Sequence, residues 1–380
     1  MTLFPSDRLK GIDKTLIRQI NDRADASCIN LGLGELDFPT PAALLERVSA
    51  ELNSWPMGYT ANAGLPELRG LIAERSGSGL TVEHVCVTIG AEEAIFAVLM
   101  VLVNAGDEVL VPDPGFPAYA AIVRMAGGIP VGYALPPESH FALDGEEVAR
   151  RITPRTRALV INSPHNPTGA VYSGEELSRL AGLCRRHGLI ALSDEVYREI
   201  VFEGRAESLS DYYEPTVVIN SLSKTYSMTG WRLGWCVAHP ELIRMLGTFN
   251  QLAISCPPAV CQRAAILALQ GVADEEKKKN IEELKKRRDL AARCLDRVMG
   301  LKYHKPRGAF YIWADISARL SPSRTALDVA LQLIEMEKVV AIPGSAFGRS
   351  AEGFLRLSFA ASPENIEEGI RRIGRFLGRA

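Results

Sequence analysis

The chain has 380 residues, of which 47% are hydrophobic and 23% are charged, and its formal net charge is -2. This length favours one large domain with a smaller one, and the composition is that of an ordinary globular protein. The near-neutral charge excludes an electrostatic case for nucleic acid or an anionic membrane as partner. The longest apolar run, 94–103, is too short to span a bilayer. The seven cysteines show no C-x-x-C pair and no histidine at metal spacing, so we expect a cytoplasmic protein with reduced cysteines and no metal site.

Two loops near the N-terminus carry residues that suit ligand binding. The first, 31–41, is rich in glycine and proline, so its backbone can approach a ligand closely, although a plain connector has the same composition. Pro41 suits the first turn of a helix predicted over 42–52. The second loop begins at Tyr59 and enters a helix near Pro66. Tyr59 is either a half-buried packing residue or a donor to a phosphate group.

From residue 85 onward, short β-branched runs alternate with helical segments. The seven predicted strands cover residues 85–89, 108–111, 129–135, 157–162, 189–193, 216–219 and 233–238. The last run follows the sixth too closely for a helical crossover, so we expect it to be antiparallel. The alternation predicts an α/β fold, in which a seven-stranded, mostly parallel sheet has helices on both faces.

Chemically useful residues follow five of these strands, at the edge where such sheets bind ligands. They are the turn at Gly90, which opens a helix at Ala91 and Glu92, and then Phe116, Asn166, Asp194 and Lys224. Free amides at the helix start could bind an anion, although glutamates are also ordinary in a first turn. Phe116 could stack on a planar ligand or cover the sheet edge, and Asp194 could meet a cation or cap the next segment. Asn166 lies in a rigid, proline-rich turn.

Lys224 gives the sharpest chemical indication. It follows an apolar strand, lies near Ser221 and Ser223, and precedes Arg232 by eight residues. Partial burial and a nearby arginine both lower the pKa of a lysine and leave its amine free to attack a carbonyl. The hydroxyls and Arg232 suit a phosphate, so the segment favours a phosphorylated carbonyl cofactor held as a Schiff base. A lysine that caps a strand end beside ordinary loop serines is the simpler alternative.

Two residues outside this set have competing interpretations. His165 could be a catalytic base, but a lone loop histidine more often makes a structural hydrogen bond or faces solvent. Arg356 interrupts an apolar alternation, where it could face solvent or bind a carboxylate through two hydrogen bonds. The run around it, together with 308–313 and 339–342, predicts strands of a second, smaller α/β unit. Residues 274–298 predict a long helix with a charged, solvated face.

Four motifs in combination resemble the fold-type I pyridoxal-phosphate (PLP) aminotransferases of class I and II, the aspartate aminotransferase-like group. They are N-x-P-x-N-P-T-G at 162–169, S-D-E-V-Y at 193–197, S-x-S-K…G-W-R at 221–232 and F-L-R-L-S-F at 354–359. The resemblance covers nearly the whole chain. It implies an enzyme that moves the amino group of an L-amino acid to a 2-oxo acid through a PLP Schiff base on Lys224. We expect a large PLP-binding domain at 41–272 and a small domain formed by 1–40 and 273–380.

The resemblance also implies roles for residues around the cofactor ring. Lys224 would form the Schiff base and then shuttle the substrate proton. Asp194 would pair with the pyridine nitrogen and keep it protonated, so that the ring accepts electrons. Asn166 and Tyr197 would contact the phenolic oxygen of the ring. Phe116 would stack on the ring, and both Phe116 and Asn166 would border the substrate.

A second set of roles concerns the phosphate and the substrate. By the same resemblance, the phosphate would be held by Ala91, Glu92, Ser221, Ser223 and Arg232. Tyr59 would reach the phosphate of the partner subunit, so the active unit would be a homodimer. Arg356 would bind the α-carboxylate of the substrate, and Gly34 would lie along the substrate.

Two departures leave the amino donor open. Phe116 stands where aspartate-specific members often carry tryptophan, and Ala91-Glu92 has no hydroxyl where many members place one. The sequence also shows no identifiable second arginine for a side-chain carboxylate. Aspartate, alanine and an aromatic amino acid are therefore all admissible.

Two rival functions use the same scaffold. A PLP-dependent Cβ–Sβ lyase would employ the same Lys224 and Asp194, but it would form pyruvate and ammonia without a 2-oxo acid acceptor. A non-enzymatic PLP-binding sensor would carry a basic DNA-binding domain before this fold, and we expect none here because the aminotransferase-like part begins almost at residue 1.

Overall fold

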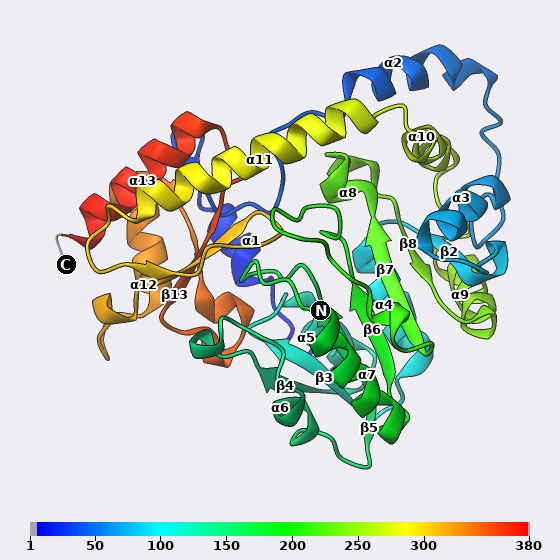
Figure 1. The fold of residues 1–380 in the computed structure, drawn as a ribbon, viewed down its shortest axis with the longest axis horizontal. Coiled ribbons are helices and arrows are strands. Elements are labelled where there is room, and N and C mark those ends of the chain that lie inside the picture. The colour runs from blue at the N-terminus through cyan, green and yellow to red at the C-terminus, as the bar shows by residue number, and fades with distance from the viewer. Residues whose placement is uncertain (1–5, 379–380) are drawn as a thin grey trace, which may run out of the picture.

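The computed structural model describes residues 6–378 and has the predicted α/β architecture (Figure 1). Its large sheet has the strand order β2-β8-β7-β6-β5-β3-β4. These strands are Val85–Thr88 (β2), Glu108–Asp113 (β3), Ile129–Ala134 (β4), Thr156–Asn162 (β5), Ile190–Asp194 (β6), Thr216–Ser221 (β7) and Gly234–Val237 (β8). Strand β8 is antiparallel to both neighbours and the remaining pairs are parallel, as predicted.

Helices cover both faces of this sheet because its central strands are apolar on both sides. Leu159 and Ile161 of β5 pack into the core that contains α7 (Gly174–His187), whereas Val160 packs into the core that contains α4 (Ala91–Leu102). Successive side chains of a strand point to opposite faces, so a strand buried on both faces needs a continuous apolar run. Each such buried aliphatic side chain contributes roughly 2 kcal/mol.

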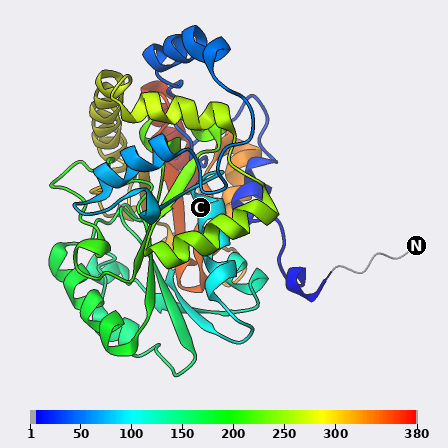
Figure 2. The same ribbon diagram turned by 90° about the vertical axis from the view of Figure 1, so that its right-hand side faces the viewer.

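A third core lies at the β2 edge of the sheet. There β2 and β8 pack against α2 (Ala42–Glu51), α3 (Pro66–Ser76) and α10 (Ala259–Leu269). In both views α2 lies at one end of the molecule (Figure 1, Figure 2). The other helices of the described chain are α1 (Leu16–Asn21), α5 (Ala118–Met125), α6 (Gly145–Ala149), α8 (Leu222–Thr225), α9 (Pro240–Ala253), α11 (Asp274–Leu295), α12 (Ala326–Gln332) and α13 (Pro363–Leu377).

The C-terminal part forms two smaller sheets, and one of them includes a strand of the N-terminal segment. An antiparallel sheet has the order β12-β13-β10-β9, and a separate parallel pair joins β1 to β11. The strands are β1 (Ile29–Asn30), β9 (Lys302–Tyr303), β10 (Tyr311–Asp315), β11 (Val339–Val340), β12 (Ile342–Pro343) and β13 (Phe354–Ser358). Segments some 300 residues apart therefore share one sheet, while the domain boundaries at residues 40 and 272 remain a prediction.

Two predicted strands of the C-terminal part differ from the observed ones. The strand expected over 308–313 begins only at Tyr311, because Ala309 has a φ of +55° and left-handed backbone cannot continue an extended ladder. The strand expected over 339–342 is divided at Ala341. Its first half pairs with β1 and its second half pairs with β13, so the chain passes from one sheet to another at this point.

Helix α11 crosses the molecule from the α10 side to α13, as Figure 1 shows. The prediction that its charged face is solvated is wrong for two arginines. Arg287 is buried, donates to Asp37 at 2.6 Å and lies over the ring of Phe38 at 4.4 Å. Arg288 is also buried and pairs with Glu203. Arg287 thus anchors the 31–41 loop to α11. None of the described helices is long and apolar enough to cross a membrane.

Candidate active site

The predicted site residues gather around one cavity of about 260 Å³ at the carboxyl ends of β5, β6 and β7. Twelve of them line it: Gly34, Ala91, Glu92, Phe116, Asn166, Asp194, Tyr197, Ser221, Ser223, Lys224, Arg232 and Arg356. Tyr59 does not line the cavity and is 92% exposed. The N-terminal loop and β13 bring Gly34 and Arg356 to the edge of the large sheet, so the cavity lies between the two parts of the chain.

Lys224 lines this cavity from the four-residue helix α8, which directly follows β7. Its Nζ donates a hydrogen bond to the carbonyl oxygen of Gly34 at 2.7 Å. Burial lowers the pKa of Lys224 to about 8, and the positive charges of Arg356 and Arg232 act in the same direction. About a tenth of the amine is therefore unprotonated at pH 7, far more than for an ordinary lysine, and the unprotonated form is the nucleophile.

Asp194 ends β6 and presents a buried carboxyl group to the cavity. The hydroxyl of Tyr119 donates to its Oδ2 at 2.5 Å, and the amide of Val196 donates to its Oδ1 at 3.3 Å. Burial raises the pKa of Asp194 to about 6, and these hydrogen bonds oppose the rise. A buried carboxylate without a cationic partner is costly, so the position suits a ligand that brings a positive charge.

Another part of the cavity wall is suited to an anion. Helix α4 begins at Ala91 with unsatisfied amides, and the guanidinium of Arg232 lies beside the Gly90 turn. Gly90 has a φ of +98°, and a Cβ at this position would lie only 2.6 Å from Nη2 of Arg232. The Ser221 hydroxyl donates to Ser223 at 2.8 Å and so places both hydroxyls here. Only glycine at position 90 therefore allows the guanidinium of Arg232 to lie against this turn.

The two glutamates of the α4 first turn take different directions. Glu92 is exposed at the cavity rim. Glu93 folds back beneath the turn, where its Oε2 accepts the Ile89 amide at 3.2 Å, and burial raises the pKa of Glu93 to about 7. Neither carboxylate blocks the free amides at the start of the helix.

Arg356 projects from β13 and is only 2% exposed, so the solvent-facing interpretation is wrong. It donates to Asn166 Oδ1 at 3.0 Å and to the Gly32 carbonyl at 2.6 Å. Its guanidinium lies 4.3 Å from the centre of the Tyr311 ring, and burial lowers its pKa. Its Nε has no hydrogen-bond partner among residues 6–378. A flat, fixed, incompletely bonded guanidinium is suited to a carboxylate ligand.

Sequence reasoning missed several residues of the cavity. Tyr119 holds Asp194, and Tyr311 exchanges a 2.9 Å hydrogen bond with Tyr197. The other unpredicted lining residues are Ile17, Ile95, Asn162, Val196 and Thr229. Tyr119 follows Phe116 by one helical turn, a spacing that could have indicated it. Tyr311 carries no local signal, because only the packing of β10 against Tyr197, in the segment after β6, brings it to the site.

His165 does not line the cavity and is fully buried. Its Nδ1 shares a 2.8 Å hydrogen bond with the hydroxyl of Thr168, and burial lowers the pKa of His165 to about 3. A neutral histidine locked inside the turn favours the structural interpretation over the catalytic one.

A lysine that shares one cavity with a buried carboxylate and an anion site, at the carboxyl edge of this sheet, is the arrangement of a PLP-dependent enzyme of fold type I. Residues 26–373 match the family described as aminotransferase class I and II, and the chain belongs to that family. It is a PLP-dependent aminotransferase.

Individual relatives cover almost the whole chain. A putative aminotransferase, YugH, of Bacillus subtilis is 38% identical over 99% of both chains. A probable aspartate/prephenate aminotransferase of Aquifex aeolicus is 39% identical over 92% of this chain and 91% of its own. The solved aspartate aminotransferase of Thermus thermophilus with maleate superposes with a TM-score of 0.93 and 34% identity, covering 99% of this chain and all of that one.

The residues present fit PLP by the chemistry of the groups that face the cavity. The wall at the start of α4 offers amides, hydroxyls and Arg232 to a phosphate, and Asp194 in the same cavity would face a protonated ring nitrogen. Lys224 lines the same cavity, feels the charges of both Asp194 and Arg232, and has a lowered pKa. Phe116 lies in the same wall and packs edge-on against Tyr119 with ring centroids 5.6 Å apart.

Proposed function

We propose that Lys224 is the lysine that binds the cofactor and moves the substrate proton, in an aminotransferase whose amino donor has an uncharged side chain. PLP supplies an electron-accepting ring that makes the amino-acid Cα acidic. Asp194 would keep the nitrogen of that ring protonated, since a buried carboxylate raises the pKa of a cation beside it. Arg356 would bind the α-carboxylate and so turn proton transfer into a step between fixed groups. This proposal rests on one observation, which is that Lys224, Asp194 and Arg356 line the same cavity.

Tyr197 and Asn166 would restrain the phenolic oxygen of the ring. Tyr197 is buried, and its hydroxyl is already positioned by Tyr311. Burial raises the pKa of Tyr197, so the group remains a neutral hydrogen-bond donor in the working pH range. Asn166 is fixed through its backbone amide, which donates to Asn162 Oδ1 at 2.8 Å. Both side chains can therefore contact a ligand without a change in the backbone.

The lowered pKa of Lys224 predicts how cofactor attachment depends on pH. The rate at which PLP attaches to the apoenzyme should rise with pH up to about 8 and then level off, because the free amine is the reactive form. An ordinary lysine would give a rate that still climbs toward its usual pKa of about 10.4. Stopped-flow absorbance during reconstitution measures the profile. A rate that keeps rising steadily beyond pH 9 would contradict the assigned role.

The charges around the cavity support a donor with an uncharged side chain. The cationic side chains that line it among the described residues are Lys224, Arg232 and Arg356, and each has a role above. Two carboxylates lie nearby instead. Glu92 is at the rim, and Glu35 accepts a hydrogen bond from the lining residue Thr229. A second substrate carboxylate would meet like charge there.

A panel of amino donors tests this substrate class. Alanine, leucine, phenylalanine and aspartate would each be offered with 2-oxoglutarate and with pyruvate, and the new amino and 2-oxo acids quantified. We expect the best uncharged donor to exceed aspartate in kcat/KM by at least about tenfold. A preference for aspartate would overturn the substrate class. Formation of pyruvate and ammonia from cysteine conjugates without an acceptor would instead favour the lyase, and the absence of turnover with every donor would favour the sensor.

The homodimer is a proposal that rests on Tyr59 and the surface around it. Tyr59 is 92% exposed, and two other large apolar side chains, Met57 and Leu252, are 51% and 83% exposed. The loop is nevertheless anchored, since the Asn62 amide donates to the Ser255 carbonyl at 2.6 Å. An ordered loop that presents an aromatic residue away from its own cavity suits a role in a partner's site. We also propose the cytoplasm as location and the two-domain division at residues 40 and 272.

Mixed dimers test the position of Tyr59. Tyr59→Ala should weaken PLP binding by about tenfold, the loss expected for one hydrogen bond to a charged group. Dimers assembled from one Tyr59→Ala chain and one Lys224→Ala chain should regain one tight site that borohydride can reduce, because Tyr59 and Lys224 then meet from different chains. If the mixed dimers bind no better than Tyr59→Ala alone, Tyr59 does not act across subunits. Equal melting temperatures of the variants would exclude a general effect on folding.

A further inference from the structure

A second cavity, of about 620 Å³, lies on the other side of β7 from the active site. It is formed by the end of β7, by α3, and by the segment that follows β6. Ser221 lines both cavities, while its neighbour Asn220 lines only the second one. Because successive side chains of a strand alternate, the two cavities lie back to back across one strand. None of the roles proposed above uses this second cavity.

Its floor is apolar and partly aromatic. The side chains that form it come from α3, β7, α8, β8 and α10, with Tyr226 just after α8; they are Ile72, Val218, Leu222, Tyr226, Trp235 and Leu269. The volume lies within the range of pockets that hold small organic ligands, and such pockets are usually apolar with a few fixed polar groups. The floor therefore suits a flat or aliphatic ligand body.

The rim of the cavity is cationic. Arg75, Arg198 and Arg205 line it, against the single carboxylate of Glu199. Glu199 is already paired with Lys277 at 2.9 Å. Arg205 forms no ion pair with any residue between 6 and 378. Arg198 is paired with Glu195, so the positive charge left for a ligand is that of Arg75 and Arg205.

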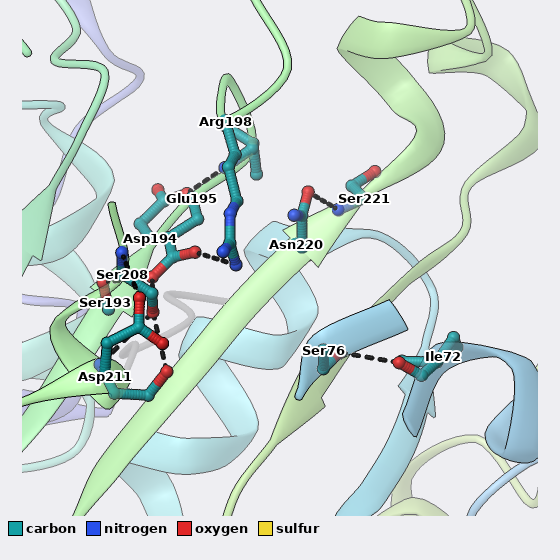
Figure 3. Close-up of polar contacts among 12 residues, drawn as sticks. Ile72, Ser76, Ser193, Asp194, Glu195, Arg198, Ser208, Asp211, Asn220 and Ser221 are labelled. Atoms are coloured by element: carbon teal, nitrogen blue, oxygen red, sulfur yellow. Dashed lines mark hydrogen bonds and ion pairs between the residues drawn. The ribbon is translucent and has the colours of Figure 1, made fainter. Parts of the chain in front are cut away.

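Arg198 is fixed from behind by a buried network, which Figure 3 shows beside Asn220 and Ser76. Its Nη1 donates to Glu195 Oε2 at 3.0 Å. Glu195 is 1% exposed and also accepts hydrogen bonds from Ser193 at 2.9 Å and Ser208 at 2.6 Å. Glu195 directly follows Asp194. Because Asp194 points into the active site, the side chain of Glu195 points away from it. The network places a guanidinium at the rim without leaving Glu195 unpaired.

Asn220 adds a polar group at the same rim. Its Oδ1 accepts the Ser221 amide at 2.7 Å, which fixes the orientation of the side-chain amide. Its Nδ2 makes no hydrogen bond to a residue of the described chain. A preoriented amide donor close to a fixed guanidinium is a recurrent arrangement for a phosphate or a carboxylate.

We propose that this cavity binds a small organic anion, with a phosphate or carboxylate head at the arginine rim and an apolar or aromatic body on the floor. Phenyl phosphate is a suitable probe, because it combines both parts. Holoenzyme reduced with borohydride is the protein to use, since the PLP that is then covalently attached fills the phosphate subsite of the active site. Calorimetric titration should give one binding event for each chain, and phenyl phosphate should bind at least about tenfold more tightly than inorganic phosphate because of the apolar floor.

Charge-removing variants locate the binding event. Arg75→Gln combined with Arg205→Gln should weaken phenyl phosphate binding by about tenfold or more. The matched control is Arg179→Gln combined with Arg244→Gln, which removes the same charge from exposed sites on α7 and α9 and should leave binding unchanged. Arg205→Gln alone, at an exposed residue, keeps the test valid if the loss of the Arg75 contact to Leu269 affects folding. Absence of binding at millimolar probe, or equal loss in the control, would overturn the proposal.

Discussion

Lys224→Ala should leave a folded protein that transfers no amino group, with kcat reduced by at least about 10⁴-fold. The variant lacks both the amine that attaches the cofactor and the base that moves the substrate proton. The part of the cavity suited to an anion and Asp194 remain in place, so we expect PLP still to bind without covalent attachment. Borohydride treatment followed by peptide mapping should find cofactor on residue 224 in the wild type and on no residue in the variant.

Lys277 is the matched control for this experiment. It is also mostly buried, with a side chain 15% exposed, but it pairs with Glu199 at 2.9 Å and with Asp274 at 3.1 Å. Its partners hold the pKa of Lys277 above that of an ordinary lysine despite the opposing effect of burial, so its amine stays protonated. Lys277→Ala should therefore retain the label on Lys224. A label that persists in Lys224→Ala and disappears in Lys277→Ala would reverse the assignment.

Asp194→Asn should lower kcat on the order of 10³-fold while PLP remains bound. An amide cannot stabilise a protonated ring nitrogen by charge, so the electron-accepting capacity of the ring falls. Tyr119→Phe is the companion variant, because it removes the 2.5 Å hydrogen bond but keeps the carboxylate. We expect it to cost only about tenfold. Similar losses in both variants would mean that Asp194 acts through its hydrogen bond rather than through its charge.

The stability of the apoenzyme gives an independent measurement at the same residue. Burial raises the pKa of Asp194 from 3.8 to about 6, so the folded state holds this proton more tightly than the unfolded chain. The resulting destabilisation is absent below about pH 4, grows as pH rises to about 6, and is then roughly 3 kcal/mol. Asp194→Asn removes this cost. Its apoenzyme should therefore be the more stable of the two at pH 8, with a difference that shrinks toward pH 4 in urea titrations.

Much of the site could be predicted because its parts are local to strand ends. Asn166 and Lys224 lie within four residues of the end of an apolar strand, and Asp194 is the last residue of one. Such apolar runs predict buried strands, and parallel strands place their carboxyl ends at one edge. The antiparallel β8 was predictable for a similar reason, since a short connection forbids a helical crossover. In these cases the positions of the residues along the chain determine which of them lie close together in the fold.

The order of residues along the chain was therefore enough to predict the large sheet and the residues on its ligand-binding edge. The burial of Arg356 and the hydrogen bond between Tyr311 and Tyr197 became known only from the folded structure. So did the division of residues 339–342 between two sheets. The physical reason is the same in each case. These positions depend on contacts between segments far apart in the chain. An alternation of apolar residues predicts that a side chain faces a core, but it does not predict which distant segment forms the rest of that core.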